Sequence, residues 1–235
     1  MLNYVNSKQM GRGIHGWLDS HFHFSFAEYY NPENIQFGVL RVLNDDIVQP
    51  ETGFDTHPHQ NMEILSYVVE GELTHADSMG NEQTLTRGQV QYMSAGTGVL
   101  HSEYNNGNGL LRFLQIWILP DKAGYRPNYG DYRFKLEDRN GRWLPLATGA
   151  ENKESVAPIH IHQDINAYAT ILSKGESIDF HVGKDRQAYM VLAEGRAQVE
   201  GIALDKRDAV EIIEQDVAVR AGEGAHIVVI EMAKA

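Results

Sequence analysis

The chain has 235 residues, of which 20 are basic and 32 acidic, so its formal net charge is −12. Acidic residues outnumber basic ones in both halves, which argues against a direct nucleic-acid or membrane partner, and the absence of cysteine excludes disulfides, thiolate catalysis and cysteine-ligated metal centres. The N-terminus carries no apolar signal segment, and no stretch approaches the ~20 apolar residues of a membrane helix, so a cytoplasmic protein is expected.

The hydrophobic pattern predicts short β-strands along the whole chain. Residues 22–26 alternate between aromatic and polar side chains, and apolar runs rich in β-branched residues occupy 64–69 and 111–119. The second half holds five further short runs of this kind, at 188–192, 197–199, 210–213, 217–219 and 227–230. Turns containing glycine or asparagine separate the runs, and no long amphipathic helix is visible. The expected fold class is therefore all-β, as an antiparallel sandwich or barrel.

A faint internal repeat suggests that one β unit occurs twice. Residues 67–72 resemble residues 191–196 at an offset of 124, and residues 95–98 resemble residues 221–224 at an offset of 126. Either match alone would be at the level of chance. Two matches in the same order and at nearly one spacing predict a duplicated β-barrel.

Four residues of metal-ligand type form the strongest local pattern. His57 and His59 are two residues apart, and His101 and Glu103 stand in the same relation about forty residues later. On a β-strand residues i and i+2 point to the same face, so each pair presents two side chains together. Two such strands side by side would direct three imidazole nitrogens and one carboxylate at one point. That donor set suits Fe(II), Mn(II), Ni(II), Cu(II) or Zn(II), whereas the alternative of scattered histidines requires the whole pattern to be accidental.

Two acidic residues compete for the place of fourth ligand. Glu63 follows the first histidine pair with the same parity as His57 and His59, so parity does not decide. An extended strand rises ~3.3 Å per residue, which places Glu63 ~13 Å from His59 unless the strand bends. Glu103 is the preferred ligand, and Glu63 is expected to be a nearby supporting carboxylate.

These segments resemble the metal-binding motifs of the cupin superfamily, and more closely those of the pirin family. The resemblance is dense over residues 11–120 and thin afterwards, and it includes five segments beside the two motifs: 16–20, 24–30, 40–46, 77–80 and 93–98. It implies a bicupin, two tandem cupin barrels of the double-stranded β-helix or jelly-roll type. The expected domains are a metal-binding one over residues 1–132 and a degenerate one without metal over residues 133–235.

The second copy carries other residue types at the positions of the four ligands. At the two offsets the equivalents are His181 for His57, Gly183 for His59, Ile227 for His101 and Val229 for Glu103. The second barrel is therefore interpreted as structural or gating, with an approach of His181 to His226 as the alternative. Two further histidine pairs are interpreted without a ligand role: His21 and His23 as packing residues, and His160 and His162 as part of a surface strand.

The resemblance implies quercetin 2,3-dioxygenase activity on a flavonol and dioxygen. Glu103 would be both a metal ligand and the base that takes the proton of the flavonol 3-hydroxyl, before the central ring is cleaved and carbon monoxide released. One divalent ion is expected; Fe(II) is favoured, and Zn, Mn, Ni, Co and Cu are alternatives. Pirin relatives also suggest a non-enzymatic, iron-dependent regulator that binds a protein partner. A monomer is expected.

Overall fold

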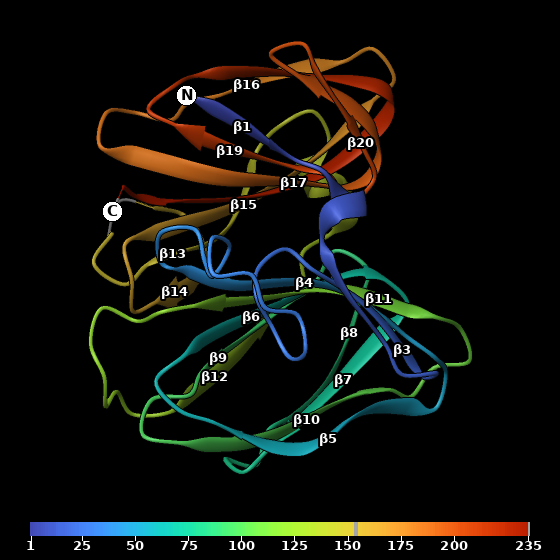
Figure 1. Cartoon of the computed structure of the whole chain (residues 1–235). Coiled ribbons are helices and arrows are strands. Elements are labelled where there is room, and N and C mark those ends of the chain that lie inside the picture. The colour runs from blue at the N-terminus through green and yellow to red at the C-terminus, as the bar shows by residue number, and fades with distance from the viewer. Residues whose placement is uncertain (153–154, 235) are drawn as a thin grey trace. The chain divides into compact units, whose positions relative to one another are not determined.

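The computed structural model describes residues 1–152 and 155–234; residues 153, 154 and 235 of the predicted second domain lie outside the described residues. The described residues form two short 3-10 helices, Ser7–Gln9 and Leu136–Arg139, and twenty strands, which confirms the all-β class. Figure 1 labels most of these strands. No helix in the described part of the chain is long and apolar enough to span a membrane. The chain divides into two compact units, unit 1 with residues 1–9, 137–160 and 164–235 and unit 2 with residues 10–136 and 161–163.

Unit 2 contains two antiparallel sheets. The larger has the strand order β12-β9-β6-β11-β4-β3-β2, and the smaller has the order β5-β10-β7-β8. Their strands are β2 (Gly11–Ile14), β3 (Leu18–Phe22), β4 (Leu40–Val48), β5 (Thr52–His59), β6 (Glu63–Glu70), β7 (Glu72–Asp77), β8 (Glu82–Thr86), β9 (Val90–Ser94), β10 (Val99–Asn105), β11 (Leu111–Ile118) and β12 (Asn128–Tyr132). A buried apolar cluster that includes Val68, Leu73, Leu85 and Phe113 joins side chains from both sheets. Burial of side chains of this size contributes about 1.5–3 kcal/mol each.

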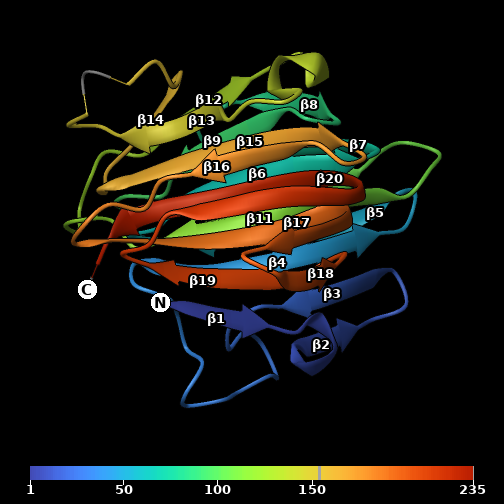
Figure 2. The same cartoon turned by 90° about the horizontal axis from the view of Figure 1, so that it is seen from above.

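Unit 1 is built on one nine-stranded antiparallel sheet. Its main order is β1-β19-β17-β20-β15-β13-β14, with β16 paired to β20 and β18 to β17; Figure 2 shows β1 beside β19. The strands are β1 (Leu2–Val5), β13 (Leu144–Gly149), β14 (Ile159–Ile161), β15 (Ile165–Ser173), β16 (Ser177–Phe180), β17 (Arg186–Val199), β18 (Ile202–Asp205), β19 (Ala209–Ile213) and β20 (Val217–Ala233). Alternate residues of paired strands form its core, among them Met190, Val210 and Val229.

The predicted strands are partly right. The runs at 64–69 and 111–119 coincide with β6 and β11, but β3 ends at Phe22, so the strand expected over residues 22–26 is wrong. There the Ser25 hydroxyl donates to backbone carbonyls of Asn31 and Asn34, and Ala27 has a φ of 48°, which turns the chain away from a strand. The runs at 188–192 and 197–199 form one strand, β17, and those at 217–219 and 227–230 form another, β20. Each strand continues through positions where the register between them shifts.

Glycine explains why the internal repeat is visible in the sequence. Gly71 and Gly195, which are matched at the offset of 124, have φ values of 80° and 84°. A Cβ atom would lie 2.3 Å from the Leu110 carbonyl oxygen at the first position and 1.8 Å from the Gly224 carbonyl oxygen at the second. Both positions, Gly71 between β6 and β7 and Gly195 within β17, therefore need glycine because a neighbouring backbone passes close by.

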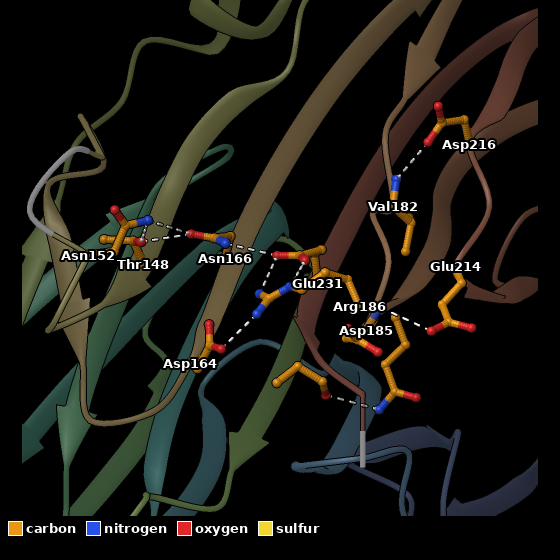
Figure 3. A network of polar contacts seen from close by, with 12 residues as sticks. Thr148, Asn152, Asp164, Asn166, Val182, Asp185, Arg186, Glu214, Asp216 and Glu231 are labelled. Atoms are coloured by element: carbon orange, nitrogen blue, oxygen red, sulfur yellow. Dashed lines mark hydrogen bonds and ion pairs between the residues drawn. The ribbon is translucent and has the colours of Figure 1, made fainter.

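A polar network joins four segments of unit 1 (Figure 3). Arg186 of β17 forms a fork with Glu231 of β20, with 2.8 Å between Nη2 and Oε2, and its Nη1 lies 2.6 Å from Oδ2 of Asp164. Asn166 of β15 donates to the same Glu231 at 2.8 Å and accepts from the hydroxyl of Thr148 in β13. The guanidinium is thus matched by two carboxylates, which indicates a structural role.

Candidate metal centre

The two histidine motifs lie on neighbouring strands of the smaller sheet of unit 2. In the antiparallel pair of β5 and β10, His101 is opposite His57 and Val99 is opposite His59. The register then shifts, because Glu103 is opposite Phe54, so that β5 contains one residue more than β10 over this stretch. β7 pairs with the other edge of β10 and places Asp77 opposite His101 and His75 opposite Glu103.

Three imidazoles meet at one point. The ring centroids are 4.5 Å apart for His57 and His101, and 4.8 Å apart for the pairs that His59 forms with each of them. One ring nitrogen of each residue lies within 4.8 Å of those of the other two, so this cluster could hold a metal ion. His57 and His59 are half-buried, and His101 is buried.

The donor atoms are suited to a divalent ion. Nε2 of His101 is buried and has no hydrogen-bond partner, a costly condition that a metal at this position would relieve. Nδ1 of His57 lies 2.7 Å from the carbonyl oxygen of Asp55, so Nδ1–H donates there and Nε2 keeps its lone pair. The residues present therefore fit a metal centre.

Burial and mutual repulsion keep two of the rings neutral. Burial lowers the pKa of His59 to about 4 and the pKa of His101 to about 3, and in both residues nearby imidazoles add to the effect. Both are therefore unprotonated at neutral pH and can donate a lone pair to a cation.

Glu103 is buried beside this cluster and is held by three donors. Its Oε1 accepts hydrogen bonds from the Ser66 hydroxyl at 2.7 Å and from Nε2 of Gln91 at 2.5 Å, and its Oε2 accepts one from Nε2 of Gln115 at 2.5 Å. Glu103 also belongs, with His75 and His101, to a second group whose ligand atoms lie within 4.8 Å of one another. Its carboxylate is thus fixed in orientation and lies near His101, but it is not part of the group that His57, His59 and His101 form.

Glu63 is engaged elsewhere in unit 2. Its carboxylate accepts hydrogen bonds from the Tyr92 hydroxyl at 2.9 Å, the Ser94 hydroxyl at 2.6 Å and the backbone N–H of His162 at 3.1 Å. The His162 ring approaches the same carboxylate at 3.3 Å and stacks on Tyr125 with centroids 3.6 Å apart. His160 is exposed, as expected of a surface strand, whereas His162 has this partner 99 residues away, which no local pattern predicts.

The other histidines have separate surroundings. His23 is fully buried, and His21 lies 3.9 Å from Asp19. In unit 1 the exposed His181 pairs with Asp216 at 2.6 Å, and the buried His226 pairs with Glu194 at 2.8 Å. Among the described residues, both groups with metal-binding spacing belong to unit 2.

A cavity of about 620 Å³ opens beside His57, His59 and Glu103. One part of its wall is aromatic and is formed by Trp17, Phe22, Phe26, Phe54 and Trp117. Another part is polar and is formed by Ser20, Asn44, Asp46 and Gln115. Apolar walls with a few convergent polar groups are typical of small-molecule sites. Sequence reasoning missed the polar wall, whose one local signal is the run of Asn44, Asp45 and Asp46 inside an apolar strand.

Asp46 is a buried acid in this wall, and burial raises its pKa to about 8, with a smaller contribution from Asp45 and Glu103 and an opposing one from the Ser20 hydroxyl. The unfolded chain releases this proton near pH 4, so between pH 4 and pH 8 the folded state binds more protons. Below about pH 6.5 the lowered pKa values of His59 and His101 act in the opposite direction, because there the unfolded chain binds more protons at these two residues. In protein kept metal-free with EDTA, the urea midpoint should therefore fall as pH rises from about 6.5 to 8. In this pH range, Asp46→Asn should make the midpoint independent of pH, whereas Asp179→Asn, a change at an exposed aspartate, should leave the wild-type dependence intact. A wild-type midpoint that does not change with pH would contradict a raised pKa of Asp46.

Comparisons with known proteins agree with this architecture. Residues 4–118 match the family model described as pirin, and residues 150–232 match the model of a quercetinase C-terminal cupin domain. A quercetin 2,3-dioxygenase of Escherichia coli strain K12 is 36% identical over 234 residues, with 99% of each chain covered. A pirin-like protein of Caulobacter vibrioides is 41% identical over 226 residues, which are 96% of this chain and 97% of the relative.

Solved structures give the same result. The crystal structure of YhhW from Escherichia coli has a TM-score of 0.92 at 34% identity and covers 100% of this chain and 99% of its own. A crystal structure of the bacterial pirin YhhW in complex with nickel(II) has a TM-score of 0.91 at 33% identity, with 100% of both chains covered. The expected bounds and metal content of the two domains stay predictions, whereas the bicupin fold is confirmed, and the chain belongs to the pirin family.

Proposed function

We propose that this protein is a metal-dependent dioxygenase that cleaves the central ring of flavonols such as quercetin and releases carbon monoxide. The observation that carries the proposal is the cluster of His57, His59 and His101 beside a cavity with aromatic walls. The Escherichia coli relative is named quercetin 2,3-dioxygenase, which supports the substrate class.

The proposed ligands are His57, His59, His101 and Glu103. Fe(II), the favoured ion, would supply Lewis acidity and reactivity towards dioxygen. Nickel in the related YhhW structure supports a divalent ion at this kind of centre.

The protein's own groups would bind and deprotonate the substrate. The aromatic wall would hold the flat flavonol rings and exclude water. The polar wall, with Asn44 and Gln115, would form hydrogen bonds with the hydroxyl groups of the flavonol. A carboxylate oxygen of Glu103 would take the proton of the 3-hydroxyl, because this residue lines the cavity and is held in place by Ser66, Gln91 and Gln115. Quercetin and dioxygen are then converted to a depside and carbon monoxide, which balances the atoms.

The test is turnover of quercetin by iron- or nickel-loaded protein in air and under nitrogen, followed by flavonol absorbance, oxygen uptake and carbon monoxide release. Turnover on the order of 1 s⁻¹ in air supports the enzyme. Glu103→Gln should retain the metal and lose turnover, whereas Glu63→Gln, a matched change at a buried carboxylate outside the cluster, should retain both. Unchanged turnover in the first variant would remove Glu103 from the mechanism.

The regulator with a protein partner stays the alternative, and metal-loaded protein without turnover on any flavonol would favour it. The monomeric state and the cytoplasmic location also stay predictions.

A further inference from the structure

Two polar residues of β7 lie directly behind the candidate metal centre. Nε2 of His75 is 3.0 Å from Oδ2 of Asp77, and Nδ1 of His75 is 3.4 Å from Nδ1 of His101. The side chains of His75 and Asp77 are fully buried, and the His75 ring stacks on Tyr129 with centroids 4.5 Å apart at 16°. Asp77, His75 and His101 therefore form a continuous chain of contacts without intervening solvent.

The partners of Asp77 set the direction of this chain. Its carboxylate accepts from the backbone N–H of Met79 at 2.9 Å, from that of Asn81 at 3.1 Å and from Nδ2 of Asn81 at 2.9 Å. A carboxylate that accepts from these donors is ionised and has no proton to donate. Nε2 of His75, which faces it, must therefore be the donor, so the proton of a neutral His75 lies on Nε2. Nδ1 of His75 is then an acceptor, and the proton of His101 must lie on Nδ1.

This arrangement leaves Nε2 of His101 as the lone-pair nitrogen. That atom is buried without a hydrogen-bond partner, as a nitrogen reserved for a metal would be. We propose that Asp77 and His75 are positioning residues that fix His101 as the Nδ1–H tautomer and so prepare its Nε2 to bind the metal. The binding part of this inference rests on the proposed metal centre, whereas the tautomer does not.

A competing arrangement makes the opposite demand on the same proton. His75, His101 and Glu103 are close enough to hold a cation themselves, with the facing Nδ1 atoms of both rings as candidate ligands. Nδ1 of His101 would then have to be unprotonated. The contacts favour the first arrangement, because Nε2 of His101, and not its Nδ1, is the buried nitrogen left without a partner.

The proton can be located directly in metal-free protein. Long-range ¹H–¹⁵N spectra distinguish the two tautomers, and the His101 signals can be assigned by their loss in His101→Gln. We expect a protonated Nδ1 and an unprotonated Nε2 in the wild type. A protonated Nε2 would overturn the proposal, and this measurement decides even if a His75 variant does not fold.

Two substitutions at His75 separate its acceptor from its bulk. His75→Phe keeps a ring against Tyr129 but removes the acceptor, so Nε2–H should appear on His101 and nickel affinity, measured by chelator competition, should fall about 10–100-fold. His75→Asn returns an acceptor oxygen near the former Nδ1 and should restore both readouts. Failure of this rescue, or an unchanged tautomer in the phenylalanine variant, would overturn the proposal.

Asn81→Ala is the matched control, because Asn81 donates to the same carboxylate from outside the chain. It should change neither readout; a loss equal to that of His75→Phe would show that general loosening of β7 is responsible and would overturn the proposal. Absence of quercetin turnover with these results intact would reject the proposed reaction and leave the positioning role standing.

Discussion

Replacing His101 by glutamine is expected to lower nickel affinity more than ~100-fold and to abolish turnover of quercetin. His101 is the deepest of the three imidazoles, and its Nε2 is the buried atom without a partner. Loss of a residue that only supports a ligand costs about 10–100-fold in affinity, so loss of the ligand itself should exceed that range. Glutamine is similar in size and offers no imidazole nitrogen, so the loss should come from the donor.

The measurement is metal content after dialysis, with the thermal shift on nickel addition as a second readout. An ion at 100 times its Kd stabilises the folded state by about 2.7 kcal/mol, an effect that the variant should lack. His181→Gln is the matched control, since His181 occupies the position equivalent to His57 in the second copy and is exposed beside Asp216. Retention of one metal per chain by the His101 variant would contradict the assignment.

Arg112→Met is expected to cost unit 2 about 3–5 kcal/mol of unfolding free energy. Arg112 of β11 forms a buried fork with Asp45 of β4, with 2.8 Å between Nε and Oδ1 and 2.5 Å between Nη2 and Oδ2. Removal of the guanidinium leaves the Asp45 carboxylate buried without its countercharge, which is why one-sided loss is so costly. Urea unfolding of metal-free protein measures the effect.

Two further variants show whether burial causes this cost. The fork between Arg12 and Asp19 has similar geometry but is exposed, so Arg12→Met should cost far less. Adding Asp45→Leu to Arg112→Met should recover much of the loss, because both charges are then absent. A small effect of Arg112→Met alone, equal to that of Arg12→Met, would show that the buried pair does not contribute as described.

The features that could be predicted from the sequence depend on residues close together in the chain, such as pairs two residues apart on one strand. His57 and His59 share a face because they are two residues apart on a strand, and the same holds for His101 and Glu103, so their gathering in one region follows from spacing. The repeat is visible because Gly71 and Gly195 each meet a backbone that no side chain can approach.

Features that depend on pairing between distant strands were beyond the sequence. The contact between His75 and His101 exists because β7 and β10 are neighbours in a particular register, and His162 reaches Glu63 across 99 residues. The polar wall with Asp46 requires knowledge of which face of β4 looks into the cavity. The wrong prediction of a strand at residues 22–26 has a related cause. The alternating pattern favours a strand, but the hydrogen bonds of the Ser25 hydroxyl to the following loop turn the chain away from one.

The extra residue of β5 changes which residues of the strand face the interior. The register shift between His57 and Phe54 reverses the parity of the inward-facing residues. The imidazoles of His57 and His59 therefore face the cavity at one end of the strand, and the ring of Phe54, which packs on Trp17, faces it at the other. Deleting one position there would send either the ligands or the ring outward. Among relatives, chain length between these two positions should therefore be held more strictly than the identity of the residues in between.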